Sequence, residues 1–229
     1  MSIFKPVSNT NLYVEVINAI IKAIAMGELK SGEKIIEQNI AKEMEISRAP
    51  IREAIRELSA QGILEYTPKK GATVAEVNAK NIEEAYSLRA LLEGMAIRLA
   101  IKNLSDDDIN KMKELSKEMT QNLRQNNIEE FIEKDVQFHN LICEKSDHFK
   151  LQKLIRNFIL QTKLYMIMSK YNMLINFELS MEYGVHDKLI KYIEEKNEKK
   201  AEEAMQQHIL NSGQVLLNYI KKKNETSTL

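Results

Sequence analysis

Residues 47–71 read SRAPIREAIRELSAQGILEYTPKKG, and this stretch decides the fold of the N-terminal part of the chain. Apolar side chains recur at helical spacing until Gly62, a residue that commonly ends helices. Ser47 suits the N-cap of this helix, and Pro50 is tolerated because it lies within the first turn. Residues 63–74 contain two short β-prone runs on either side of a turn. The stretch therefore predicts a helix followed by a β-hairpin.

Two further helices are predicted before this stretch. Residues 10–26 carry apolar side chains at helical spacing, and a shorter helix is expected over 37–44. The short helix over 37–44, the tight turn after it, the helix that begins at Ser47 and the hairpin together form the pattern of a winged helix-turn-helix. The second helix of that motif is the element that enters the major groove of DNA.

Basic residues occur on this second helix and at the tip of the hairpin. Arg48, Arg52 and Arg56 lie four residues apart, on the side of the helix opposite its apolar face. Arginine is well suited to forked hydrogen bonds with guanine or phosphate. Lys69 and Lys70 lie at the tip, beside Gly71, where a small residue lets the backbone approach DNA closely.

An ordinary alternative exists for the arginines. Arg52 and Arg56 are each followed by a glutamate, Glu53 and Glu57, and the four could form ion pairs on a solvated helix. The formal net charge of the 229-residue chain is zero, so any attraction to DNA must come from a local cluster such as this one.

The composition limits the class of protein. A single Cys excludes disulfide scaffolds and Cys-rich zinc sites and fits a reducing cytoplasm. The first 25 residues lack the pattern of a signal peptide, and no apolar run approaches the roughly 20 residues needed to span a bilayer. We expect a soluble cytoplasmic protein without a membrane partner.

The C-terminal part is predicted to be all helical. Beyond Gly71 the chain has no proline and only three glycines. Amphipathic helices are expected over 80–102, 106–125, 128–145, 148–170, 178–195 and 198–221. The predicted fold class is mainly α, with a winged helix-turn-helix over 1–77 and an all-α bundle of six or seven helices over 78–229.

Four polar residues of this bundle could hold a metal ion. Asp135 and His139 are four residues apart and project from one face of a helix, whereas His186 and His208 lie on later helices. Antiparallel helices could bring the four side chains together inside the bundle. One carboxylate and three imidazoles suit Zn, Ni, Mn or Fe. The alternative is that they are ordinary polar positions.

The N-terminal residues resemble the GntR superfamily of transcription regulators. The resemblance covers residues 12–77 and is carried by ELKSGEKI (28–35), EQNIA (37–41), SRAPIREAI (47–55), Gly62 and Gly71. It implies that Arg48 and Arg52 contact DNA, with Ser47, Ala49 and Gly71 nearby.

Two positions depart from the pattern of the superfamily. Ser31 replaces a usual proline, and Gln38 stands where some members carry an arginine that contacts DNA.

Residues 78–229 resemble the C-terminal ligand-sensing domain of the FadR-type branch, the FCD domain. The matching motifs are RxxLE, from Arg89 to Glu93, and DxxFH, from Asp135 to His139; His186 and His208 fall at further metal-ligand positions. The resemblance implies a divalent metal, Zn first and Ni, Mn or Fe otherwise, and a pocket for a small organic acid.

Arg89 has two readings. It could face the pocket and pair with the carboxylate of the effector, or it could form an ion pair with Glu93 one turn away. His148 is expected at the exposed start of a helix, and Cys143 is expected to be buried packing rather than a ligand. The stretch from Tyr165 to Tyr171 could line a pocket, although core or dimer packing is the commoner role of such a stripe.

We therefore expect a homodimeric transcription regulator, a repressor, that binds a palindromic DNA operator and responds to a metal-anchored carboxylate effector. It is not expected to be an enzyme. Two alternatives stay open at this point: a metal-dependent hydrolase, and a sensor for which the metal ion itself is the signal.

Overall fold

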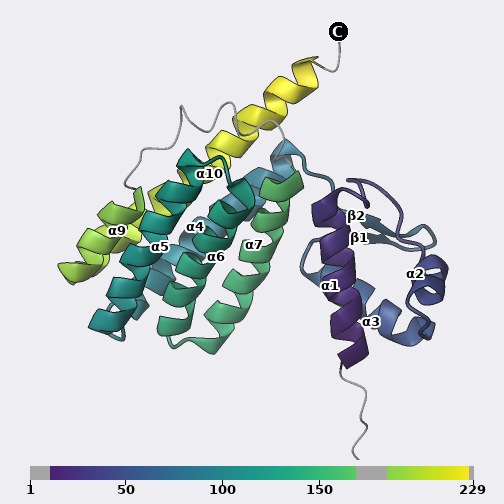
Figure 1. Cartoon of the computed structure of the whole chain (residues 1–229), viewed down its shortest axis with the longest axis horizontal. Helices are drawn as coiled ribbons and strands as arrows, with labels where there is room; N and C mark the ends of the chain where they lie inside the picture. The colour runs from purple at the N-terminus through teal and green to yellow at the C-terminus, as the bar shows by residue number, and fades with distance from the viewer. Residues whose placement is uncertain (1–10, 169–184, 227–229) are drawn as a thin grey trace, which may run out of the picture. The chain divides into compact units, whose positions relative to one another are not determined.

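The computed structural model describes residues 11–168 and 185–226 of the chain (Figure 1). It divides into two compact units, residues 1–76 and residues 77–229, and each unit is described by itself. Among the described helices, none is both long and apolar enough to cross a membrane.

The N-terminal unit is a winged helix-turn-helix, as predicted. It contains α1 (Asn11–Met26), α2 (Glu37–Glu43) and α3 (Arg48–Ala60), followed by strands β1 (Leu64–Thr67) and β2 (Gly71–Val74). The strands pair antiparallel, with Leu64 opposite Val74 and Thr67 opposite Gly71. The apolar face of α3 is buried, and it consists of Ile51, Ala54, Ile55 and Leu58.

The turn of the hairpin has an unusual backbone. The Lys70 amide donates to the Thr67 carbonyl over 3.1 Å, and Pro68 and Lys69 are the central residues between them. Lys69 has φ +69° and Gly71 has φ +92°. Proline followed by a positive φ is the pattern of a type II turn, whose second central position favours glycine. Lys69 is thus held in a conformation that few lysines adopt, at the tip of the wing.

The C-terminal unit is an all-α bundle, as predicted. Its described helices are α4 (Ala79–Ala100), α5 (Asp106–Arg124), α6 (Ile128–Lys145), α7 (Phe149–Met168), α9 (Val185–Glu194) and α10 (Glu198–Thr226). Helix α4 packs against α10, α7 and α6, and Figure 1 shows α5, α6 and α7 side by side. Residues 169–170 and 178–184, which we predicted to be helical, lie outside the described residues.

Two glycines allow α4 and α10 to approach closely. A Cβ atom at Gly213 would lie 2.7 Å from Cγ of Tyr86 on α4. A Cβ atom at Gly94 would lie 2.7 Å from Cγ of Gln206 on α10. Since real contacts are longer than this, any larger residue at either position would require its neighbour to move. The close packing of α4 on α10 positions the site described below.

Two serines occupy the N-cap positions of helices, and they behave differently. Ser105 forms a complete capping box with Asp108 at the start of α5. Lys145 Nζ also lies 2.6 Å from Asp108 Oδ2, which ties α5 to the end of α6. Ser47 occupies the N-cap position of α3, but its side chain makes no capping hydrogen bond. The Ser47 hydroxyl is exposed, so water can replace that bond at little cost.

Candidate functional site

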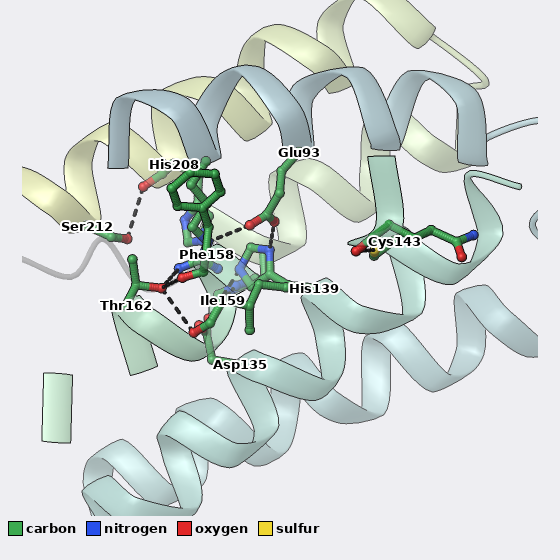
Figure 2. A network of polar contacts seen from close by, with 12 residues as sticks. Glu93, Asp135, His139, Cys143, Phe158, Ile159, Thr162, His208 and Ser212 are labelled. Carbon is green, nitrogen blue, oxygen red and sulfur yellow. Dashed lines mark hydrogen bonds and ion pairs between the residues drawn. The ribbon is translucent and has the colours of Figure 1, made fainter. Parts of the chain in front are cut away.

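The four predicted metal ligands lie together inside the helical unit. Asp135 and His139 come from α6, His186 from α9 and His208 from α10, and one possible ligand atom of each lies within 4.8 Å of the others. All three histidines are buried, and Asp135 is half-buried. Figure 2 shows Asp135, His139 and His208 directed toward a common region. The fold thus brings together residues separated by up to 73 positions in the sequence.

The hydrogen bonding of the cluster is incomplete in a way that fits a cation. Nε2 of His139 and Nε2 of His186 are buried, and neither makes a hydrogen bond of good geometry among the described residues; the same holds for the facing atoms Nδ1 of His139 and Oε2 of Glu93, which are close enough for an ion pair. They lie 3.5 Å and 3.2 Å, respectively, from Oδ1 of Asp135. Buried polar atoms of native proteins are nearly always satisfied, by protein, water or an ion. Two orphaned imidazole nitrogens beside a carboxylate have the chemistry of a transition-metal site.

A buried carboxylate behind His139 orients its ring. Glu93 Oε2 lies 2.5 Å from Nδ1 of His139, on the opposite side of the ring from Asp135 (Figure 2). A proton on Nδ1 that points at Glu93 leaves Nε2 directed at the cluster. Such carboxylate partners commonly set the tautomer and raise the basicity of a metal-ligating histidine.

Glu93 is in turn held by Arg89 from the same helix. Nε of Arg89 donates to Glu93 Oε1 over 2.5 Å, and Nη1 donates to Thr162 Oγ1 on α7 over 3.0 Å. Both members of the ion pair are almost completely buried, with exposed side-chain fractions of 4% and 2%. A chain of polar contacts therefore runs from Thr162 through Arg89 and Glu93 to His139.

The charges in this network balance. Burial alone would lower the pKa of His139, but Glu93 and Asp135 outweigh it and raise that pKa to about 9. Burial would raise the pKa of Asp135, yet His139 and His186 hold it well below its usual value. Burial and the two neighbouring histidines lower the pKa of His208. Two cations, Arg89 and His139, thus face two carboxylates, and a bound metal ion would have to displace the proton of His139.

From the sequence, Glu93 was predicted only as a possible ion-pair partner of Arg89. The structure contains that ion pair and adds the contact of Glu93 with His139, which sequence reasoning did not find. The i, i+4 spacing of Arg89 and Glu93 signals the first contact. The contact between Glu93 and His139 joins residues that lie 46 positions apart on two helices, and no spacing rule indicates it.

Two other residues lie where the sequence reasoning expected them. Cys143 is buried, and burial raises the pKa of its thiol to about 11. His148 is exposed just before α7, where its Nδ1 accepts a hydrogen bond from the Leu151 amide. Tyr165 is buried in the core, and residues 169–173 of the stretch that follows it lie outside the described residues.

The expected DNA-binding residues lie on the surface of the N-terminal unit. Arg48 and Arg52 are exposed at the start of α3, and both pair with one carboxylate oxygen, Glu37 Oε2 on α2, at 2.6 Å and 2.9 Å. For Arg52, this replaces the pairing within α3 that the sequence suggested as an alternative. Burial would raise the pKa of Glu37, but the two arginines outweigh it and lower that pKa.

The remaining expected contacts also lie near the surface. Ser47 and Ala49, at the start of α3, are exposed. Lys69 and Lys70 are exposed at the tip of the wing, and Gly71 is half-buried. The unit therefore presents cations from both α3, which we call the recognition helix, and the wing formed by β1, β2 and the turn between them.

Comparison with known proteins assigns both units. The family of bacterial regulatory proteins called gntR matches residues 12–74, and the FCD domain matches residues 84–211. The uncharacterised HTH-type transcriptional regulator YdhC of Bacillus subtilis (strain 168) is 31% identical over 218 residues, which cover 92% of this chain and 91% of YdhC. The gluconate operon transcriptional repressor of the same strain is 30% identical over 134 residues, which cover 58% of this chain and 55% of the repressor.

Solved structures share the fold. The E. coli protein McbR/YncC superposes with a TM-score of 0.73 at 23% sequence identity, covering 92% of this chain and 99% of that one. This identity is too low to carry function, so the likeness concerns the fold. The two matched families and the similarity to YdhC along most of the chain show that this protein is a GntR-family DNA-binding transcription regulator of the FadR-type branch, with an FCD effector-binding domain.

Proposed function

We propose that the protein is a homodimeric repressor whose affinity for a palindromic operator responds to a small organic acid bound at a metal centre. The observation that carries the proposal is the cluster of Asp135, His139, His186 and His208, with its two orphaned Nε2 atoms and the buried Glu93 behind His139. A repressor role is further supported by the relative that is named as a repressor of the gluconate operon.

The four clustered residues would hold a divalent transition metal, with Zn favoured and Ni, Mn or Fe as alternatives. An ion bound there would supply a Lewis-acid position at which the carboxylate of an effector binds. Because its ligands come from α6, α9 and α10, the ion would join three helices at one centre. Metal and effector would thus act on the packing of the whole helical unit.

Arg89 contributes to the effector site in a different way from a free arginine. Its guanidinium is already engaged by Glu93 and Thr162, so a carboxylate that binds there must share Arg89 with Glu93. We propose that the main role of Arg89 is to hold Glu93 in its charged form, and that contact with the effector is secondary.

On the DNA side, Arg48 and Arg52 would read base edges or phosphates in the major groove, with Ser47 and Ala49 close to the backbone. Lys69 and Lys70 would meet phosphates, and Gly71 would let the wing approach them closely. Two-fold symmetry of the dimer would place two such surfaces on the two halves of a palindrome.

The metal is tested on the full chain purified without chelator. Elemental analysis should find about one transition-metal ion per chain, and stripping it should lower the thermal midpoint. Saturation at a hundredfold excess over Kd corresponds to about 2.7 kcal/mol of stabilisation. His139→Ala should abolish this metal-dependent increment, whereas His148→Ala, at an exposed position outside the cluster, should leave it unchanged.

Absence of metal, together with a thermal midpoint that added Zn, Ni or Mn does not move, would reject the metal centre. The DNA role is tested separately, by operator titration. Arg48→Ala should cost about 1–3 kcal/mol of operator affinity if Arg48 reads a base edge. Arg156→Ala, at an exposed position in the helical unit, should cost nothing. Equal affinity of the folded Arg48→Ala protein would contradict the assignment.

The same titration separates the proposal from its two alternatives. If chelation alone releases the operator and organic acids have no further effect, the metal ion itself is the signal. If purified protein hydrolyses substrates in a metal-dependent manner and binds no DNA, the alternative hypothesis of a metal-dependent hydrolase is correct. Release by an organic acid only in the presence of metal is the result that the proposal requires.

A further inference from the structure

A buried serine on α5 is tied to the residue that follows a candidate metal ligand. Ser116 Oγ donates to Oδ1 of Asp187 over 2.7 Å, and Asp187 comes directly after His186 in α9. Helices α5 and α9 pack against each other, and Figure 1 shows them side by side. This hydrogen bond belongs neither to the ligand cluster nor to the polar network behind His139.

Ser116 stands where an apolar residue would suit the fold better. The other buried positions of α5 are Met112, Leu115 and Met119, so the serine interrupts an apolar face. Its exposed fraction is 7%. Serine is a weaker helix former than alanine, and burying a hydroxyl is unfavourable unless it is hydrogen-bonded. The bond to Asp187 is therefore the compensation that this position needs.

Asp187 faces α5 rather than the metal-ligand cluster. Adjacent residues of a helix point about 100° apart, so α9 can direct His186 inward and Asp187 toward its neighbouring helix. Among the described residues, the four side chains whose possible ligand atoms lie within 4.8 Å of one another do not include Asp187. Asp187 is therefore placed to hold the helix and not the ion.

The apolar face of α9 fixes the orientation of the helix only coarsely. Helix α9 has ten residues, and its buried apolar side chains are Leu189, Ile190 and Ile193. Apolar contacts are non-directional, so they tolerate some rotation about the helix axis. A rotation of about 20° moves a side-chain tip, which lies about 5–6 Å from the axis, by about 2 Å. Metal–ligand distances tolerate only about 0.2 Å, so the rotation of α9 needs a directional contact.

A second contact joins the same two helices, but it is less suited to this task. Lys113 Nζ lies 2.6 Å from Glu194 Oε1, and the two side chains are 49% and 45% exposed. Exposed ion pairs contribute little, and long side chains can follow a helix that rotates. Glu194 also lies eight residues from His186, about 12 Å along the helix axis. The bond between Ser116 and Asp187 has a buried donor and lies one residue from the ligand.

We infer that Ser116 and Asp187 are positioning residues for the metal centre, because their hydrogen bond sets the rotation of α9 and thereby aims His186 at the ion. The inference rests on the proposed function, since it assumes that the cluster holds a metal, and deepens it by adding a contact outside the ligand set. Nε2 of His186 lies 3.2 Å from Oδ1 of Asp135. Rotation of α9 would change this distance and separate its ligand from those on α6 and α10.

Metal titration of the full chain, first stripped and then loaded with Zn or Co(II), tests this role. Ser116→Ala should lower the affinity for Zn about tenfold, at the lower end of the 10–100-fold loss that is typical for residues that orient a ligand. The visible absorption of bound Co(II) depends on the number and geometry of its ligands and should change as well. Thr120→Val is the matched control, because the Thr120 hydroxyl bonds within α5, to the Ser116 carbonyl over 3.0 Å. It should leave the affinity and the spectrum unchanged.

Variants of Asp187 separate positioning from charge. Asp187→Ala should lose as much Zn affinity as Ser116→Ala. Asp187→Asn should retain most of the affinity, because its amide oxygen can still accept from Ser116. If the carboxylate instead acted on the ion through its charge, Asp187→Asn would lose as much as Asp187→Ala, Ser116→Ala would lose little, and the inference would be wrong.

The outcomes separate this inference from the proposed function. If the wild type binds metal and Ser116→Ala matches Thr120→Val in Zn affinity and Co(II) spectrum, the inference is overturned and the metal centre stands. A lower thermal midpoint of metal-free Ser116→Ala, with the affinity and the spectrum unchanged, means that the bond is merely structural and also overturns it. A wild-type protein that binds no metal rejects the metal centre of the proposed function and this inference with it.

Discussion

Replacing Glu93 with Gln is expected to destabilise the metal-free protein strongly. Glu93 is buried, accepts a hydrogen bond from Arg89 over 2.5 Å, and forms an ion pair with His139 at the same distance. Removing one member of a buried ion pair leaves an uncompensated charge, which typically costs about 3–5 kcal/mol. Because glutamine keeps a carbonyl oxygen that can accept from Arg89, we expect the lower end, about 3 kcal/mol.

The same substitution should also weaken metal binding. With a neutral amide behind it, His139 loses the carboxylate that orients its ring, and loss of such a partner typically costs 10–100-fold in affinity. The two effects are read separately. Thermal unfolding of chelator-stripped protein gives the first, and competition with a chromophoric chelator gives the second. At about 2–4 °C per kcal/mol for units of this size, the thermal midpoint should fall by roughly 6–12 °C.

A double-variant cycle shows whether the loss is electrostatic. Arg89→Met and Glu93→Met should each be strongly destabilising, and the two together should be closer to the wild type than either single variant, because fewer buried charges are left unpaired. If the metal-free Glu93→Gln protein melts within about 2 °C of the wild type, the ion pair contributes nothing and our account of the network is wrong. If only the metal affinity is unchanged, Glu93 has no part in positioning His139.

Three further predictions concern the surface of the protein. Neutralising Lys69 and Lys70 together should weaken specific and non-specific DNA binding alike and reduce the slope of log affinity against log salt by roughly 0.9 per lost phosphate contact; a loss confined to one operator sequence would contradict this. Glu37→Gln should raise DNA affinity up to about fivefold, since exposed ion pairs of about 0–1 kcal/mol no longer compete for the recognition-helix arginines; lower affinity would mean that Glu37 orients them. The Lys145 contact and the capping box lower the pKa of Asp108 to about 2, so the stability that its carboxylate supplies is present above about pH 4 and lost as the pH falls toward 2. Asp108→Asn should therefore be less stable than the wild type by about 1 kcal/mol at pH 7, with the difference vanishing in acid; a constant difference would exclude this origin.

The sequence by itself was sufficient for the elements and the family. Local rules of periodicity and turn formation act within a few residues, so they predicted the helices of both units and the hairpin. The capping box at Ser105 is a contact of the same local kind, since its partner Asp108 is three residues away. At Ser47 the N-cap position was predicted correctly but the hydrogen bond was not, because an exposed hydroxyl has water as an equally good partner.

The candidate metal ligands were named from the sequence because one pair shares a helix face and all four match a family pattern. Their meeting within 4.8 Å, however, depends on how α6, α9 and α10 pack. The orphaned nitrogens and the buried Glu93 behind His139 are also properties of that packing.

Tertiary structure alone decided the long-range partners of Arg52 and Glu93. Arg52 reaches Glu37, 15 residues away, rather than the glutamate next to it, and Glu93 reaches His139 across two helices. The physical reason is that helix propensity and apolar periodicity fix the backbone locally, whereas a charge chooses among all the groups that the fold brings within a few ångströms. Burial then raises the strength of the contacts that it selects, and burial is a property of the whole chain rather than of any segment of it.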